Sequence, residues 1–248
     1  MDLAGKVAIV TGGQGGIGHP ICVDLAKAGA DVVISGRRID DEADVVKEIR
    51  ALGRKALPVK ADVGIKADVD NMVKKTLETF GQVDILVNCA GFTKPAMLHK
   101  MKEENWDAVI QAHLKGTFLT TQAVCHNMME RKTGSIINIV SSAGQQGTIG
   151  QVNYAAAKGG IIAFTMACAR ELAPYGVTVN AISPFAETEM TSKIATDEKL
   201  REKYLARVPM GRFGQPEEMS PIVVFLSGPG SRYITGQIIS VDGGMVMG

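Results

Sequence analysis

The sequence has little that points to a secreted, metal-binding or membrane protein. Its four cysteines, Cys22, Cys89, Cys125 and Cys168, are scattered, with no CxxC pair and no nearby pair of histidines. Neither a disulfide framework nor a metal site is therefore expected, and reduced thiols fit the cytosol. No apolar run approaches the roughly 20 residues of a membrane-spanning helix, and the opening MDLAGK does not resemble a signal peptide. We expect a cytoplasmic protein that does not contact membranes.

The sequence also lacks an excess of positive or negative charge. The formal net charge is +1 at pH 7, so there is no basic field to attract nucleic acid and no acidic tail for basic partners. The 248 residues are 46% hydrophobic and 21% charged, which is the balance of an ordinary protein with one substantial core. We expect residues 1–248 to form a single domain that does not bind nucleic acid.

Apolar runs and helical stretches alternate along the whole chain, with turn residues between them. Several runs are apolar on both faces, which is typical of strands in a parallel sheet that helices cover on both sides. The predicted strands are Val7 to Val10, Asp31 to Ser35, Ala56 to Ala61, Ile85 to Asn88, Ser135 to Val140, Val177 to Ser183 and Gln237 to Val241. The pattern predicts an α/β protein with a doubly wound parallel sheet, whose strand ends and following loops meet at one ligand-binding edge.

A glycine-rich turn joins the first strand to the first helix, in the segment VAIVTGGQGGIG from Val7 to Gly18. In such a turn Gly12 permits the tight bend, Gly16 lets backbone N–H groups approach a pyrophosphate, and Gly18 lets the helix pack closely on the strand. A flexible solvent loop is the alternative, but the flanking strand and helix favour a dinucleotide site at the helix N-terminus. The candidate residues are Gly12, Gln14, Gly15, Gly16, Ile17 and Gly18.

The ends of the next strands carry further candidate contacts to a dinucleotide. Arg37 and Arg38 follow the second strand, where an acidic residue would hold a ribose 2′-hydroxyl. A guanidinium suits a 2′-phosphate, so these residues favour NADP over NAD, with two solvated arginines as the alternative. The remaining candidates are Asp62 and Val63 at the adenine, and Asn88, Ala90 and Gly91 beneath a ribose. A helix cap and a simple tight turn are the alternatives for these two groups.

Ser141, Tyr154 and Lys158 form the set with the clearest chemical meaning. Tyr154 and Lys158 are four residues apart on one face of a predicted helix, so an ammonium lies near a phenol. A positive neighbour and a nicotinamide cation would lower the phenol pKa from about 10, so that it exchanges a proton near neutral pH. Ser141 could hold a carbonyl oxygen that becomes more negative as hydride arrives. Each piece alone is ordinary, but their order behind a dinucleotide turn predicts a redox site.

The chain resembles the short-chain dehydrogenase/reductase family over essentially its whole length, through TGGQGGIG, NCAG, the Ser141, Tyr154 and Lys158 set, RFGQPEEM and ITGQIISVDGG. The resemblance implies a Rossmann-type sheet of order 3-2-1-4-5-6-7 and a nicotinamide cofactor. It implies Tyr154 as general acid/base, Lys158 as the residue that binds ribose and lowers the phenol pKa, and Ser141 as the group that polarises the carbonyl. It also implies a homotetramer formed through two long helices, Glu103 to Lys132 and Tyr154 to Tyr175, and through the last strand.

The chain departs from the family pattern at two places near this site. His113 stands where the family usually has asparagine, the fourth member of its catalytic set, whose backbone carbonyl holds a proton-relaying water. A histidine preserves that carbonyl, and a directly catalytic imidazole and a structural histidine are both open. After the sixth strand, SPFAETEM is one residue short, with Phe185 in the region of a glycine. Pro184 and Thr188 are still expected to contact the cofactor, with Thr188 at the nicotinamide amide.

Loops at the same edge predict a pocket for a neutral substrate of mixed polarity. Its candidate residues are Ser141, Gln145, Gln151, Phe92, Phe185 and Met190, beside a polar segment near 186–210 that is expected to form a mobile lid. Within the family, the tail is most similar to β-ketoacyl-ACP reductases. Those reductases dock acyl carrier protein through basic residues, of which one aligns with Lys132 and another with Tyr175, so half of the docking pair is missing here.

We therefore expect an NADP(H)-dependent oxidoreductase that interconverts a ketone and a secondary alcohol, with a 3-oxoacyl thioester of acyl carrier protein or CoA as the substrate. A sugar or polyol reductase of the same family, and a non-catalytic NADP-binding sensor, are the alternatives.

Overall fold

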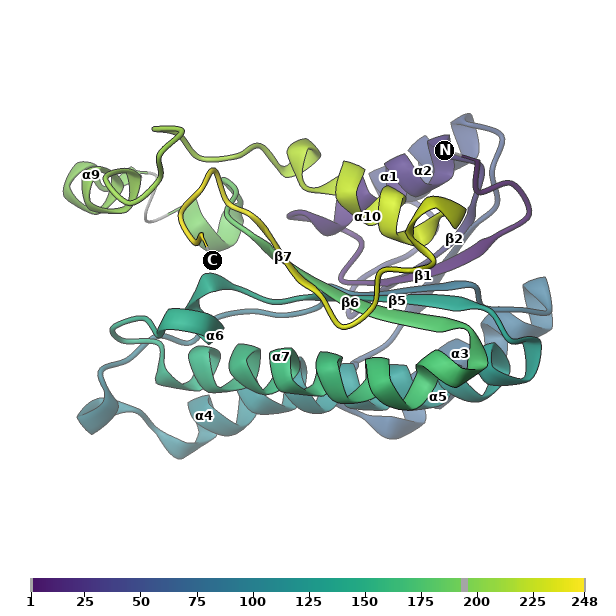
Figure 1. Cartoon of the computed structure of the whole chain (residues 1–248), viewed down its shortest axis with the longest axis horizontal. Coiled ribbons are helices and arrows are strands. Elements are labelled where there is room, and N and C mark those ends of the chain that lie inside the picture. The colour runs from purple at the N-terminus through teal and green to yellow at the C-terminus, as the bar shows by residue number, and fades with distance from the viewer. Residues whose placement is uncertain (1, 193–195, 248) are drawn as a thin grey trace.

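Seven apolar segments form one sheet, and all neighbouring strands are parallel (Figure 1). The computed structural model describes residues 2–192 and 196–247. The strand order is β3-β2-β1-β4-β5-β6-β7, which confirms the predicted topology. The strands are β1 Val7–Thr11, β2 Asp31–Gly36, β3 Ala56–Lys60, β4 Ile85–Asn88, β5 Gly134–Ile139, β6 Val177–Pro184 and β7 Ile238–Val241, and each agrees with its predicted bounds to within one residue.

Helices cover both faces of the sheet because successive strand side chains point to opposite sides. Ala8 and Val10 belong to the buried cluster on the face of α1, α2 and α10, whereas Val7 and Ile9 belong to the cluster on the face of α3, α5 and α7. Figure 1 shows the two layers above and below the sheet. The helices are α1 Gly18–Lys27, α2 Asp44–Ala51, α3 Lys66–Phe80, α5 Gly116–Arg131, α7 Val152–Leu172 and α10 Ser220–Ser227.

Shorter helical segments lie in the connections, mostly at the carboxyl edge of the sheet. They are η1 Leu98–Lys100, α4 Glu103–Ile110, η2 Gln111–Lys115, α6 Ser142–Gln146, η3 Ala173–Tyr175, η4 Glu189–Thr191, α9 Glu198–Leu205, η5 Pro216–Glu218 and η6 Pro229–Ser231. The single helix that was predicted from Glu103 to Lys132 is divided into α4, the π-helical turn η2 and α5. The second predicted helix corresponds to α7 and η3.

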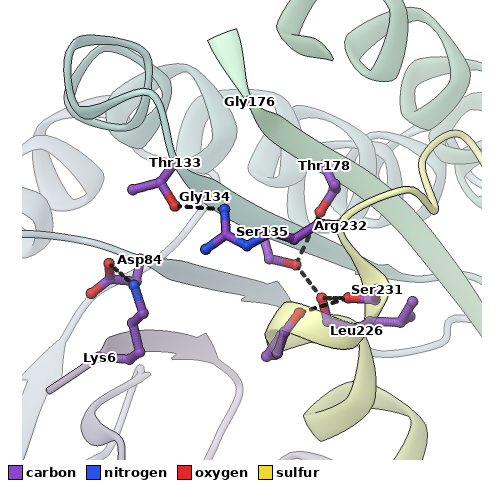
Figure 2. A pocket seen from close by; sticks show the side chains of 12 residues that line it. Lys6, Asp84, Thr133, Gly134, Ser135, Gly176, Thr178, Leu226, Ser231 and Arg232 are labelled. Carbon is purple, nitrogen blue, oxygen red and sulfur yellow. Dashed lines mark hydrogen bonds and ion pairs between the residues drawn. The ribbon is translucent and has the colours of Figure 1, made fainter. Parts of the chain in front are cut away.

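The amino edge of the sheet is held together by a buried carboxylate, Asp84, which precedes β4 and is 3% exposed. It accepts hydrogen bonds from Lys6 Nζ at 3.2 Å, Arg131 Nη2 at 2.8 Å, Gln82 Nε2 at 2.8 Å and the Val7 amide at 2.9 Å. Figure 2 shows Lys6 and Asp84 beside serine and threonine hydroxyls that bond to one another and to backbone carbonyls. The cavity there holds about 30 Å³, which is the space of one water molecule. This edge is therefore a structural one.

Among the residues that the structure describes, no helix is long and apolar enough to cross a membrane. Within the same ranges, no three side chains of histidine, cysteine, aspartate or glutamate gather in a way that could hold a metal ion.

Candidate active site

A cavity of about 730 Å³ opens at the carboxyl edge of the sheet, where the loops after β1 to β6 meet. Most of the predicted site residues line it, although they come from every part of the chain. They are Gly12, Gln14, Gly15, Gly16, Ile17, Arg37, Arg38, Asp62, Val63, Ala90, Gly91, Phe92, His113, Ser141, Gln151, Tyr154, Lys158, Pro184, Phe185, Thr188 and Met190.

Three predicted site residues do not line the cavity. Gly18 lies behind the glycine turn, where a Cβ atom would overlap the carbonyl oxygen of Gly12, so its role is the close packing expected of it. The side chain of Asn88 points into the core, where it donates to Asn138 Oδ1 at 2.9 Å and accepts from Thr120 Oγ1 at 2.6 Å. Gln145 is exposed on α6, away from the pocket. The place of Asn88 beneath a ribose, through its backbone, and that of Gln145 in the substrate pocket stay predictions.

The turns after β1 and β4 touch each other at the base of the cavity. Gly12 has a φ of +69°, and a Cβ atom there would lie 2.8 Å from Ala90 Cα, so both the bend and the close approach require glycine. Thr11 Oγ1 accepts hydrogen bonds from the amides of Cys89 at 3.1 Å and Ala90 at 3.2 Å. The glycine turn thus rests on the NCAG turn, which leaves the N-terminal end of α1 directed to the cavity.

The candidate residues for the adenosine half of a dinucleotide lie at the ends of β2 and β3. Arg37 and Arg38 are exposed, and the Arg37 guanidinium carbon lies 5.6 Å from the centre of the Phe92 ring across the cavity. Asp62 Oδ1 accepts the Gly64 amide at 2.9 Å, so one carboxylate oxygen caps its own turn. Both arginine side chains are therefore exposed at the edge of the cavity.

Ser141, Tyr154 and Lys158 converge on the opposite side of the cavity. Ser141 is the N-cap of α6, where its Oγ accepts the Ala143 amide at 3.2 Å. Lys158 Nζ lies 5.5 Å from the centre of the Tyr154 ring and donates to the Ile139 carbonyl oxygen at 2.6 Å. Consecutive turns of α7 and the end of β5 therefore bring the hydroxyl, the phenol and the ammonium together.

Burial controls the protonation of this set. Burial raises the pKa of Tyr154 to about 12, and the Ser141 hydroxyl offsets only part of that rise. Burial also lowers the pKa of Lys158 to about 8. Burial is therefore the main influence on the phenol pKa, and at neutral pH Tyr154 carries its proton and is set to donate it.

His113 lies in η2 and is 2% exposed. Its Nε2 is 2.7 Å from the Phe92 carbonyl oxygen, and its ring meets the Tyr154 ring at 5.2 Å in an edge-to-face contact. Burial, with help from the Lys158 ammonium, lowers the pKa of His113 to about 3, so the imidazole is neutral in the working range. Its place in the reaction stays a prediction.

Phe185 anchors the segment that the sequence predicts as a lid. Its ring stacks on Phe213 at 4.9 Å and on Tyr204 of α9 at 6.2 Å, and both Phe185 and Tyr204 line the cavity. Residues 193–195 of the predicted segment 186–210 lie outside the described residues. Thr188 caps η4, where its amide donates to Thr191 Oγ1 at 2.8 Å. The mobility of the lid stays a prediction.

Sequence reasoning missed two asparagines that hold the site in place. Asn153, which is fully buried beside Tyr154, donates through Nδ2 to the Lys94 carbonyl at 3.0 Å and to the Asn105 carbonyl at 3.2 Å. Asn138 of β5 donates to Thr165 Oγ1 of α7 at 2.9 Å. The available signal was a polar side chain inside the apolar run IINIV, which demands a buried partner.

This fold and this cavity define a dinucleotide-binding α/β oxidoreductase. A family model described as enoyl-(acyl carrier protein) reductase matches residues 12–246. A protein of Thermotoga maritima named 3-oxoacyl-[acyl-carrier-protein] reductase is 43% identical over 100% of both chains, and one of the same name from Synechocystis sp. is 46% identical over 99% of this chain and 98% of its own. A crystal structure described as a short-chain alcohol dehydrogenase from Sinorhizobium meliloti superposes with a TM-score of 0.95 at 36% identity, covering 98% of this chain and 97% of that one.

The chain belongs to the short-chain dehydrogenase/reductase family. Membership confirms the predicted oxidoreductase that uses a nicotinamide cofactor and acts on an alcohol or ketone. The names of the two relatives confirm the similarity to β-ketoacyl-ACP reductases that the tail sequence indicated.

Proposed function

We propose that the protein reduces a 3-oxoacyl thioester to the 3-hydroxyacyl thioester with NADPH. The observation that carries this proposal is the meeting of Ser141, Tyr154 and Lys158 with the glycine turn in one cavity. Full-length relatives that are 42–46% identical and named 3-oxoacyl-[acyl-carrier-protein] reductase support the substrate class.

Each residue of the set has a distinct task in that reaction. Bound NADPH supplies the hydride. Ser141 Oγ already accepts the Ala143 amide, so its O–H is the group left to donate to the substrate carbonyl oxygen. Tyr154, protonated at neutral pH, donates the proton that this oxygen takes up. Lys158, beside the phenol and buried, binds the ribose and carries positive charge up to about its pKa of 8.

NADPH is favoured over NADH by the residues at the end of β2. Arg37 and Arg38 are exposed at the rim of the cavity, and the strand end has no carboxylate to bind a ribose 2′-hydroxyl. A guanidinium forms paired hydrogen bonds with a phosphate, so Arg37 is assigned to the 2′-phosphate.

The substrate side of the cavity combines apolar and amide groups. Phe92, Gln151, Phe185 and Met190 suit the uncharged acyl end of a thioester. Lys132 caps the end of α5, and the neighbouring Tyr175 lies in η3. Lys132 precedes β5 and Tyr175 precedes β6, so both residues lie at the edge of the sheet opposite the cavity. Acyl carrier protein and CoA are therefore both included as thioester carriers in the test.

The protein is further proposed to be a cytoplasmic homotetramer. Phe118 on α5 and Met166 on α7 are 42% and 44% exposed on the helices through which the family associates, and this apolar exposure supports a subunit contact there.

The test is NADPH oxidation with acetoacetyl-CoA, a 3-oxoacyl carrier-protein thioester and a panel of ketoses. We expect turnover of the thioesters, tighter binding of NADPH than of NADH, loss of that preference in Arg37→Asp, and a loss of at least about 10²-fold in kcat for Tyr154→Phe. Turnover of ketoses alone would assign a sugar or polyol reductase. Cofactor binding without any turnover would assign a sensor, and both results contradict the proposal.

A further inference from the structure

The His113 ring lies between the turn after β4 and the catalytic phenol. Its centre is 6.2 Å from that of Phe92 and 5.2 Å from that of Tyr154, and it meets the second ring at 87°. The ring projects from the π-helical turn η2, a kind of turn that is often found at functional sites. His113 therefore contacts both the backbone next to the cofactor turn and the proton donor.

Two contacts of Nε2 bear on the tautomer. Nε2 lies 2.7 Å from the Phe92 carbonyl oxygen, to which it can only donate, and 3.1 Å from the Phe92 amide, which is placed to donate to it. We assign the proton to Nε2 from the shorter of the two contacts. Nδ1 is left with a lone pair, and among the described residues that buried atom has no hydrogen-bond partner. A buried acceptor without a donor destabilises the folded protein.

The neighbours of the imidazole oppose its protonation. The Lys158 ammonium repels a second positive charge, Tyr154 carries its proton at neutral pH, and Cys89, which also lines the cavity, has its pKa raised by burial to about 11. No anion therefore faces His113 from these groups near neutral pH. Transfer of protons through a charged imidazole is disfavoured, and hydrogen bonding by the neutral ring is what remains.

We propose that His113 is an uncharged positioning residue that holds the Phe92 backbone and the face of Tyr154 through its ring, and whose Nδ1 accepts a hydrogen bond from a hydroxyl group in the cavity. The donor is a water molecule or a hydroxyl group of bound cofactor or substrate, which share this chemistry. The inference rests on the proposed function, because the geometry that it protects is that of the phenol that donates the proton.

Gly91 is the partner that makes room for this ring. A Cβ atom at Gly91 would overlap Cε1 of His113 and lie 2.6 Å from Nδ1. Gly91 does not have a positive φ, so alanine is compatible with its backbone and the ring is the obstacle. A side chain at position 91 and an imidazole at position 113 therefore exclude each other.

A double-mutant cycle tests this exclusion. We expect Gly91→Ala to lower kcat by on the order of 10²-fold, because the displaced ring no longer holds Tyr154. Gly91 also lines the cofactor side of the cavity, so any direct effect on NADPH should appear equally in both backgrounds. In the His113→Asn background, where the side chain is shorter, the loss in kcat from the same Gly91→Ala change should be at least about tenfold smaller. Equal losses in the two backgrounds would overturn the proposed contact, as would a loss expressed only in KM.

Nitrogen-15 spectroscopy of the wild-type protein tests the tautomer and the acceptor without any turnover. His113→Asn identifies the His113 signals among the four histidines, and His126→Asn, an exposed histidine on α5, is the matched control. We expect Nδ1 to stay unprotonated over about pH 5 to 8, with a signal shifted by a hydrogen bond. A shift present before ligand addition identifies water as the donor, and a shift that appears only with NADP⁺ or acetoacetyl-CoA identifies a ligand hydroxyl.

Two spectroscopic results would overturn the inference: titration of His113 within that pH range, or an Nδ1 signal free of hydrogen bonding under every condition. Because these readouts need no catalysis, they separate the two proposals. A protein that turned over no thioester but gave the expected signals would contradict the proposed function alone.

Discussion

Tyr154 and Lys158 are both buried, and their shared burial decides how the site is charged before a reaction begins. Desolvation raises the pKa of the phenol to about 12 and lowers that of the lysine to about 8. The phenol therefore starts as an acid, which suits the reduction of a ketone, whereas the lysine holds a positive charge at a cost. Only 4% of Lys158 is exposed, and its hydrogen bond to the Ile139 carbonyl compensates only part of the lost hydration.

Lys158→Met should stabilise the free protein while it abolishes the reaction. The folded pKa of about 8 lies below the ordinary 10.5, so the unfolded chain binds the proton more tightly and folding is penalised below pH 8. At 1.36 kcal/mol per unit the penalty is about 3 kcal/mol, and it disappears as the pH rises from 8 to 10.5. Urea unfolding at pH 7 and pH 10.5 measures it, with the exposed Lys75→Met as the control. A variant less stable than wild type at pH 7 would contradict this account.

The clearest gap between sequence and structure lies in one helix. The family resemblance implied a continuous helix from Glu103 to Lys132, but η2 adds a π-helical turn at Gln111–Lys115. Gly116 follows this turn and packs so closely on Val63 that a Cβ atom would lie 2.7 Å from Val63 Cγ2, a tertiary contact that the sequence pattern does not contain. A single inserted residue changes no apolar pattern that could be read from the chain. The strands, by contrast, were predictable, because short runs that are apolar on both faces are typical of strands buried in a parallel sheet.

Phe185 is the residue through which the end of β6 holds α9. Its ring contacts those of Phe213 and Tyr204. These partners could not be predicted, because they follow 19 and 28 positions later in a segment with no strong pattern.

Phe185→Ala should release α9 without unfolding the sheet. Loss of two aromatic contacts to a half-buried ring removes about 1–2 kcal/mol of local stability, which makes local opening roughly tenfold more frequent. Trypsin should then cut faster at the exposed Lys199, Arg201 and Lys203, as mass spectrometry of the fragments would report. Phe80→Ala, at a half-buried ring at the end of α3, is the matched control, and equal cleavage rates in the two variants would contradict the anchoring role.

At the scale of the whole molecule the two edges of the sheet have different tasks. The carboxyl edge carries a cavity of about 730 Å³ with unpaired polar groups, whereas the amino edge is filled by the hydrogen bonds around Asp84. The site was predictable because the chemistry follows the strand ends, and parallel topology gathers those ends. The amino-edge network was not, since Lys6, Asp84 and Arg131 lie far apart in the sequence and form no motif.

Asp84→Asn should therefore lower the stability of the protein and leave its catalytic activity unchanged. The change leaves Lys6 and Arg131 facing an uncharged amide at a position that is 3% exposed, and removal of one partner of a buried ion pair costs about 3–5 kcal/mol. For a chain of 248 residues this corresponds to a decrease of about 10 °C in Tm. Asp70→Asn, which breaks the exposed pair with Lys66, should cost at most about 0.5 kcal/mol. Asp84 lies at the edge of the sheet opposite the cavity, so the KM for NADPH and the kcat of the folded Asp84→Asn variant should stay within about twofold of wild type. A larger change in either constant, at a temperature where the variant is folded, would mean that the two edges are coupled.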